Sequence, residues 1–331
     1  VLSVTSDGNP GTLYMAHLLP PDGTGQLCNV LKSTPFQQNS LVFDRFIEEL
    51  EAAMQQARAT HAIGHDGESA VLVSASSRSR IEQEERLVEL TELASSAGVT
   101  VIDRMAQRTQ DGHQRYLLGS GKLKDVLIQT LHKGADMVIF DQTLTPAQSR
   151  AISELTDIKV IDRTQLILDI FARRAHSREG KVQVELAQLR YLLPRLSGKG
   201  TQLSRLGGGI GSRGPGESKL ETDRRRIRDR ITHLEREVQH FARHQDQRRA
   251  RRTRHQMPVL SLVGYTNAGK STLLNVLTKS HVSVQDRVFE TLDTTSRRLR
   301  FPRDREVIVT DTVGFIRDLP QELLGAFRTT L

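Results

Sequence analysis

A glycine-rich segment that contains one lysine and one serine has the clearest chemical pattern in the sequence. It reads Gly264-Tyr-Thr-Asn-Ala-Gly-Lys-Ser-Thr272 and fits the G-x-x-x-x-G-K-S/T pattern of a phosphate-binding loop (P-loop). Its glycines let the backbone pass close to a phosphate, and N–H groups at the start of the next helix attract the anion. We expect Lys270 to contact the outer phosphates of a nucleoside triphosphate and Ser271 to bind Mg²⁺. The alternative is a structural glycine-rich turn without a ligand.

A second pattern lies 47 residues after Gly264, where an apolar run ends in Asp-x-x-Gly. In P-loop GTPases the aspartate, here Asp311, contacts the Mg²⁺ shell, and the glycine N–H, here Gly314, contacts the terminal phosphate. Between the two patterns, the segment Phe289-Glu-Thr-Leu-Asp-Thr-Thr295 offers the threonine of a first switch. We choose Thr291 as the Mg²⁺ ligand, and Thr294 and Thr295 remain alternatives.

Two residues bear on how such a site would hydrolyse a nucleotide. Phe315 follows Gly314, where Ras-like enzymes hold a glutamine that orients the attacking water. Intrinsic hydrolysis should therefore be slow unless another group orients water. Asn267 could ligate a potassium ion near the phosphates, which would neutralise charge in the transition state. The alternative role for Asn267 is to stabilise the loop.

Strands and helices must position these residues. The pattern predicts a buried strand at 259–263, a helix at 271–277 and a strand at 307–310, as in a P-loop α/β domain. Upstream, short apolar runs near 71–73, 99–102, 137–140 and 160–161 alternate with helical patterns. This alternation predicts a small parallel α/β sheet.

Two other upstream stretches carry little or no chemistry. The short turn from Gly119 to Lys122 could bind a phosphate, but it lacks the full P-loop spacing, and we favour a plain helix start. For residues 1–60 we expect two short strands, at 2–4 and 12–19, and a helix at 43–57.

The stretch between the two α/β parts is helical and basic. Apolar residues recur every three or four positions on both sides of a loop that holds eight glycines from Gly198 to Gly216. This pattern predicts an antiparallel helical hairpin, a coiled-coil arm, with the loop at its tip. The first seam is Val182, Leu186, Leu189, Leu193 and Leu196, and the second is Leu220, Ile227, Ile231, Leu234, Val238 and Phe241.

The positive charge of the chain is concentrated in this arm. From Arg195 to His255 there are 17 Lys or Arg and 7 Asp or Glu, a local net charge of +10, so the rest of the chain sums to −2 against a total of +8. This placement favours contact with nucleic-acid backbone over a merely solvated helix face. With only 4% aromatic residues and no Trp, base stacking is not the expected mode. The residues predicted to contact RNA are Lys199, Arg205, Arg213, Arg224, Arg225, Arg226 and Arg228.

Composition argues against a membrane-spanning protein and against a disulfide-rich one. The chain has 331 residues, 26% of them charged, which is typical of globular proteins, and no apolar run approaches the length of a membrane span. The single cysteine, Cys28, excludes an internal disulfide framework and fits a reducing cytosol. We expect a cytoplasmic monomer, with association at ribosomes or at a membrane surface as further options. Because the chain begins with Val1, we expect an interior piece of a longer protein.

These motifs resemble those of the HflX family of ribosome-associated GTPases. The most specific stretches run from Lys181 to Leu196 (KVQVELAQLRYLLPRL), from Gly207 to Glu217 (GGGIGSRGPGE) and from Asp223 to Arg226 (DRRR). GYTNAGKS, FETLD and DTVGF are also similar to the family's motifs. The resemblance covers about residue 70 to the end, and residues 1–60 look like the latter part of an extension found in longer members.

The resemblance implies a GTPase that uses GTP and Mg²⁺, with K⁺ as a further candidate ion. It would bind the large ribosomal subunit through its rRNA and split stalled ribosomes under stress. Ser271, Thr291 and, indirectly, Asp311 would hold the metal, while Lys270 and Asn267 would act in catalysis. Some family members are reported to bind ATP through the N-terminal region, which would give Lys122 a role. The predicted nucleotide-site residues are Gly264, Tyr265, Thr266, Asn267, Ala268, Gly269, Lys270, Ser271, Thr272, Phe289, Thr291, Asp293, Asp311, Thr312, Val313 and Gly314.

The predicted domains are an extension (1–66), an α/β domain (67–178), the hairpin (179–255) and a truncated GTPase domain (257–331). Guanine specificity in this class comes from an Asn-Lys-x-Asp motif, and none occurs after Gly314. We therefore expect this chain alone to bind and hydrolyse nucleotide poorly. Two alternatives stay open: a GTPase of RNA modification or ribosome assembly, and an RNA-binding factor that does not hydrolyse nucleotide.

Overall fold

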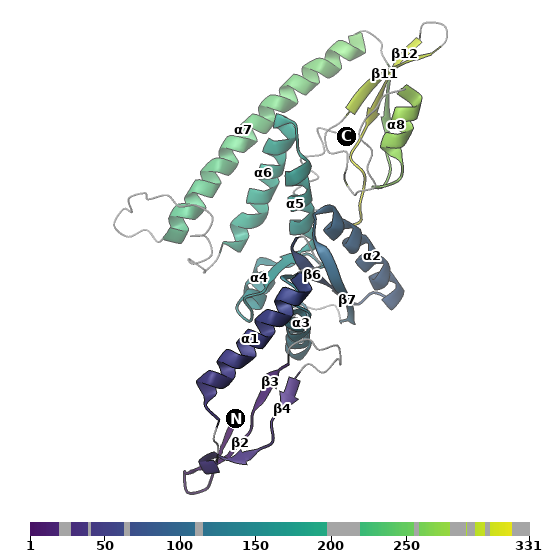
Figure 1. The fold of residues 1–331 in the computed structure, drawn as a ribbon. Helices are drawn as coiled ribbons and strands as arrows, with labels where there is room; N and C mark the ends of the chain where they lie inside the picture. The colour runs from purple at the N-terminus through teal and green to yellow at the C-terminus, as the bar shows by residue number, and fades with distance from the viewer. Residues whose placement is uncertain are drawn as a thin grey trace.

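A computed structural model describes residues 1–19, 28–38, 41–62, 67–109, 115–196, 219–254, 258–278, 289, 295–301 and 305–319. Figure 1 shows the described part as a central α/β unit, a pair of long helices beside it, a small C-terminal sheet and an N-terminal extension. No helix among the described residues is long and apolar enough to cross a membrane.

Four parallel strands form the central sheet, in the order β7-β6-β8-β9. The inner strands β6 and β8 are continuous apolar runs because helices cover both of their faces. Their register pairs Ala70 with Met137 and Val73 with Phe140, and all four of these side chains are buried. The sheet and its helices, residues 69–174, are called the sheet unit below. Its strands are β6 (Ser69–Ser76), β7 (Thr100–Arg108), β8 (Met137–Phe140) and β9 (Lys159–Asp162).

Helices lie on both faces of this sheet, as in a doubly wound fold. One hydrophobic cluster joins one face of the sheet to α2 and α5, and a second joins the opposite face to α3 and α4. Capping residues set the helix starts: Ser79 and Thr145 form capping boxes, and Pro146 occupies the first turn of α4. The helices are α2 (Arg80–Ser96), α3 (Ser120–His132), α4 (Pro146–Ser153) and α5 (Arg163–Arg174).

The predicted helical hairpin is present in α6 (Arg178–Leu192) and α7 (Lys219–Arg254). Leu234 is fully buried against Val182 and Leu186, with Ile231, Val238 and Phe241 packed around them. Ion pairs join Glu185 to Arg230, Arg190 to Glu235 and Arg178 to Glu237. The two helices run in opposite directions in Figure 1, so the pair is antiparallel.

The first seam ends earlier than its heptad spacing predicts. The α-helix stops at Leu192, and a 3₁₀-helix, η2 (Leu193–Arg195), follows it. Pro194 explains the change, because proline has no N–H to donate to the helix and its ring clashes with the preceding turn. Leu196 is nevertheless buried.

The C-terminal part holds three strands in the order β10-β12-β11, with β10 parallel and β11 antiparallel to β12. The prediction that the first strand is buried is wrong for the described structure, since Leu260 is 53% exposed. The physical reason is that β10 is an edge strand, and no described element covers the face of β10 on which Leu260 lies. The elements are β10 (Val259–Leu262), α8 (Lys270–Thr278), β11 (Thr295–Phe301) and β12 (Arg305–Asp311).

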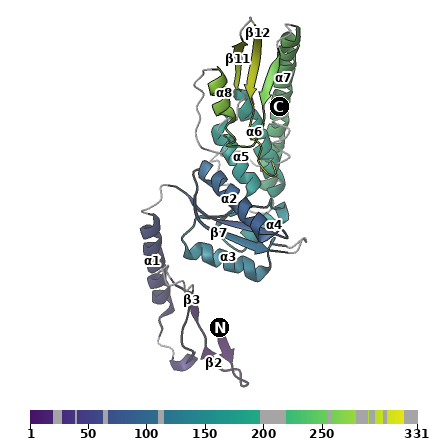
Figure 2. The ribbon, with the colours of Figure 1, turned by 90° about the vertical axis from the view of Figure 1, so that its right-hand side faces the viewer.

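The N-terminal extension lies apart from these units, at the lower end of Figures 1 and 2. It forms two small antiparallel sheets, β1-β2-β5 and β3-β4, followed by a helix. Its elements are β1 (Leu2–Val4), β2 (Pro10–Leu13), β3 (Ala16–Leu18), β4 (Cys28–Val30), β5 (Thr34–Pro35), the 3₁₀-helix η1 (Phe36–Gln38) and α1 (Phe43–Ala62).

Candidate nucleotide site

The P-loop connects β10 to α8, with the strand–loop–helix order that the sequence predicts. Two of its residues adopt left-handed backbone conformations, Asn267 at φ 59° and Gly269 at φ 79°. Glycine is unstrained in this region, and asparagine tolerates it better than most residues. The residue type at 267 therefore fits the loop's shape, whatever ligand it also contacts.

Lys270 is the first residue of α8 and turns back along the loop. Its Nζ donates to the carbonyl oxygen of Tyr265 at 2.6 Å. Partial burial lowers the pKa of Lys270, and the nearby charge of Asp311 opposes that shift. The geometry places the lysine charge against the loop backbone, where phosphates are bound in P-loops.

Ser271, in the first turn of α8, meets Asp311 at the carboxyl end of β12. Ser271 Oγ donates to Asp311 Oδ2 at 2.5 Å, and the second carboxylate oxygen of Asp311 is buried with no hydrogen-bond partner among the described residues. A hydroxyl and a carboxylate are the hard oxygen donors that Mg²⁺ prefers. These residues fit a magnesium ion, which Ser271 and Asp311 would hold and which would neutralise phosphate charge.

The segment after Asp311, residues Val313–Asp318, is called switch II below, and it lies directly on the P-loop. Phe315 N donates to Gly264 O at 3.0 Å, and Thr266 N donates to Phe315 O at 2.9 Å. A Cβ added to Gly314 would stand 2.7 Å from Thr266 Cα, so only glycine fits this approach. The sequence did not predict a direct contact between these two motifs.

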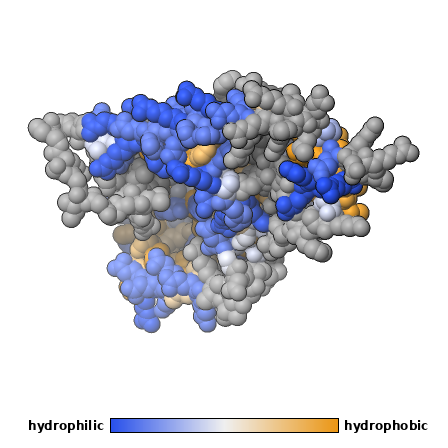
Figure 3. Space-filling view, turned by 90° about the horizontal axis from the view of Figure 1, so that it is seen from above, coloured by the Kyte–Doolittle hydropathy of each residue, from blue (hydrophilic) through white to orange (hydrophobic). Residues whose placement is uncertain are grey.

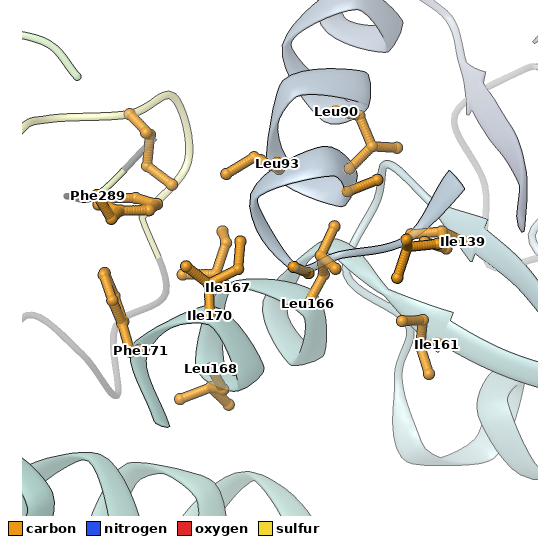
Figure 4. Close-up of a cluster of buried hydrophobic side chains, with 14 of the residues drawn as sticks. Leu90, Leu93, Ile139, Ile161, Leu166, Ile167, Leu168, Ile170, Phe171 and Phe289 are labelled. Carbon is orange, nitrogen blue, oxygen red and sulfur yellow. The ribbon is translucent and has the colours of Figure 1, made fainter. Parts of the chain in front are cut away.

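Apolar side chains of the switch regions pack into the sheet unit. Val313 and Ile316 are buried in the cluster formed by α2 and α5. Phe289, predicted as a nucleotide-site residue, lies edge-on against Phe171 of α5, with ring centroids 4.5 Å apart (Figure 4). Phe289 and switch II therefore share a core with the sheet unit.

A network of buried charges reinforces this contact at the carboxyl ends of β8 and β9. Asp141, which is fully buried, accepts from Arg86 at 2.6 Å and from Arg163 at 3.1 Å. Arg86 also donates to Asp318 of switch II at 2.7 Å, and that bond is the main reason why the pKa of Asp318 is lowered. Arg163 donates to the carbonyl oxygen of Arg317 at 3.1 Å.

The sequence interpretation missed Arg86, Asp141 and Arg163. Asp141 and Arg163 directly follow the apolar strands β8 and β9, and ligands and functional groups gather at the carboxyl ends of parallel strands. That position was a usable signal for these two residues. Arg86 lies inside a helix and gave no such signal.

The other predicted site residues lie on α7, on β11 or outside the described residues. Arg225, Arg226 and Arg228 are exposed on α7, and Arg224 is half-buried. Seen from above in Figure 3, hydrophilic residues follow α7. Thr295 begins β11. Lys199, Arg205, Arg213, Thr291, Asp293 and Thr294 lie outside the described residues.

The short Gly-Lys turn from Gly119 to Lys122 begins α3, and its N-cap Gly119 has no side chain to bond the helix end. The turn therefore lies at the start of a helix. Within the described ranges, no group of three or more His, Cys, Asp or Glu side chains is placed to hold a metal ion.

Comparison with known proteins gives a consistent result along the chain. Three family models match: "GTP-binding GTPase N-terminal" at residues 84–172, "GTP-binding GTPase Middle Region" at 174–252 and "50S ribosome-binding GTPase" at 259–330. A solved GTP-binding protein from the archaeon Sulfolobus solfataricus, in complex with GDP, is 25% identical, with a TM-score of 0.42 over 80% of this chain and 67% of that one.

Curated relatives are closer in sequence. The GTPase HflX of Caldanaerobacter subterraneus is 51% identical over 81% of this chain and 62% of its own length. The GTPase HflX of Escherichia coli is 46% identical over 80% of this chain and 62% of its own. The chain thus spans about three fifths of the length of these relatives. With the P-loop, the Asp-x-x-Gly strand end and the helical hairpin all in place, the chain belongs to the HflX family of GTPases.

Proposed function

We propose that the protein hydrolyses GTP and uses the cycle to act on the large ribosomal subunit, splitting stalled ribosomes under stress. The observation that carries the proposal is the P-loop with Ser271 and Asp311 in hydrogen-bond contact beneath it. Membership in a GTPase family and the match of residues 259–330 to a ribosome-binding GTPase model support it. We also propose that it acts as a cytoplasmic monomer, which light scattering after gel filtration would test.

The chemistry follows from the residues present. Water attacks the γ-phosphorus, the bond to the β–γ bridging oxygen breaks, and GDP and inorganic phosphate leave. Ser271, Asp311 and Thr291 would hold Mg²⁺, and Lys270 would balance charge on the phosphates. Since Phe315 offers no group to orient water, the chain's own catalysis should be slow until the ribosome completes the site.

We propose K⁺ as the ion that assists hydrolysis, held in part by Asn267. The asparagine is exposed on the P-loop in a left-handed conformation, so its side chain is accessible to an ion from solvent. Turnover in potassium should exceed turnover in sodium, and Asn267→Gly, which keeps the backbone conformation, should remove that difference. Equal rates of the unmodified protein in the two salts would contradict the role.

We propose that the arm binds rRNA through its basic residues. Arg225, Arg226 and Arg228 are exposed on α7, and Arg226 lies 3.9 Å from Asp223. Changing Arg225, Arg226 and Arg228 to Gln should weaken subunit binding and reduce its salt dependence by about three phosphate contacts. A matched control changes Arg45, Arg80 and Arg150, which are exposed on other helices, and should leave both unchanged.

The test of splitting uses intact ribosomes and the full-length protein. With a non-hydrolysable GTP analogue, sedimentation should show conversion of whole ribosomes into subunits, and the Lys270→Ala variant should not produce it. Subunit binding without splitting would favour the alternative of an assembly or RNA-modification GTPase. Binding to RNA that is indifferent to nucleotide would favour a factor that does not hydrolyse GTP.

A further inference from the structure

The described conformation closes switch II onto the P-loop. The N–H of Thr266 is bonded to Phe315 O, and the carbonyl oxygen of Gly264 accepts from Phe315 N. Backbone N–H groups of a P-loop are the groups that cradle phosphates. In this conformation one of them is engaged by switch II, and Gly314, whose N–H would contact a γ-phosphate, is pressed against Thr266.

The sheet unit also contacts switch II, at its last residues Arg317 and Asp318. Arg86 donates to the carboxylate of Asp318 at 2.7 Å. Glu89 Oε1 accepts from Arg163 at 2.7 Å and from the backbone N–H of Arg317 at 3.3 Å. Asp318 itself has a left-handed φ of 51°. A non-glycine residue keeps this conformation where surrounding contacts stabilise it.

Arg86 is anchored independently of switch II, which makes it a fixed point. Its side chain is 8% exposed and its Nε bonds the fully buried Asp141, whereas the side chain of Asp318 is 61% exposed. The Arg86–Asp318 bond can therefore break by movement of switch II alone, while Arg86 stays in place.

We propose that Arg86, acting through Asp318, is a positioning residue that sets the preference of the site between GDP and GTP. The pair holds switch II closed on the P-loop. GTP binding requires switch II to leave Thr266 and present Gly314 to the γ-phosphate, whereas GDP has no γ-phosphate and does not require it. Releasing the pair favours GTP over GDP. The inference rests on the proposed binding of guanine nucleotides, but not on any ribosomal partner.

The test is the ratio of affinities for a non-hydrolysable GTP analogue and for GDP, measured by fluorescence titration of the full-length protein. Asp318→Asn removes the charge while keeping a residue that tolerates φ 51°, and Asp318→Glu keeps the carboxylate. Asp103→Asn is the matched control. Asp103 lies on the outer strand β7, and its substitution breaks an ion pair with Lys133 that does not involve switch II. None of these side chains is placed in the nucleotide site.

Asp318→Asn should raise the ratio in favour of the GTP analogue by about three- to tenfold, as expected for loss of a partly exposed charged pair. Asp318→Glu should stay closer to the unmodified protein, and Asp103→Asn should not change the ratio. GDP affinity should be the same in all four proteins. An unchanged or lowered ratio in Asp318→Asn, with both nucleotides still bound, would overturn this inference alone. Failure of the unmodified protein to bind either nucleotide would overturn the proposed function and this inference with it.

Discussion

Gly314→Ala directly perturbs the contact between switch II and the P-loop. The new Cβ would lie 2.7 Å from Thr266 Cα and 2.8 Å from Thr266 N, and since both are backbone atoms they cannot turn aside. If the segment stayed in place, the overlap would cost about 1–3 kcal/mol. If it moved away, the contact would lose the two hydrogen bonds between Phe315 and the loop, at about 1 kcal/mol each. Either way the closed contact weakens by about 2 kcal/mol, roughly thirtyfold in its equilibrium constant.

Hydrogen exchange of the Thr266 and Phe315 amides measures this contact in the nucleotide-free protein. Both amides should be protected in the unmodified chain and should exchange about thirtyfold faster in Gly314→Ala, because local opening sets the exchange rate. Gly121→Ala is the matched control, since a Cβ there meets nothing within 4 Å. Unchanged protection of both amides in Gly314→Ala would refute the reasoning that Gly314 is required for close approach.

Three further predictions concern the hairpin, the lysine and the charge network. Leu234→Ala should destabilise the hairpin locally by about 2–4 kcal/mol, which faster amide exchange in α6 and α7 would show. Leu192→Ala, at a 40% exposed position, should destabilise it far less. Equal effects of the two substitutions would contradict the packing assigned to Leu234. Lys270→Ala should lower GDP affinity at least about tenfold, and Lys122→Ala should leave it unchanged; the reverse order would move the phosphate site to α3. Because the pKa of Asp318 is lowered below 3.8, the stability of its bond to Arg86 is present above that pH and is lost as pH falls through the lowered pKa. Amide protection of Phe315 should therefore show an acid-dependent loss that Asp318→Asn lacks, and identical pH profiles would contradict the bond.

Local sequence patterns predicted much of this fold, because strands and helices depend mainly on interactions between residues close in the sequence. Apolar runs at 71–73 and 137–140 identified β6 and β8. The heptad spacing identified the facing residues of α6 and α7. It also predicted that the first helix continues past Leu192, whereas Pro194 ends the α-helix there. The apolar run of β10 predicted burial, which depends on neighbouring elements that the run itself does not encode.

The candidate site was predictable only in part, because sequence patterns report local structure and not contacts between distant residues. Spacing between Gly264 and Asp311 identified two motifs of one nucleotide site, since both motifs are local. The network of Arg86, Asp141 and Asp318 joins residues more than 50 positions apart in the chain. Such long-range charge pairs leave no periodic signal. Phe289 shows the same limit, since its neighbour Phe171 could be identified only from the packed structure.

GTP turnover by the full-length protein, measured with and without purified large ribosomal subunits, tests the central claim most directly. The P-loop with Ser271 and Asp311 in contact, and the absence of a water-orienting glutamine at Phe315, predict slow turnover alone and strong stimulation by the subunits. Stimulation should disappear in Lys270→Ala. Turnover that large subunits leave unchanged would contradict the account.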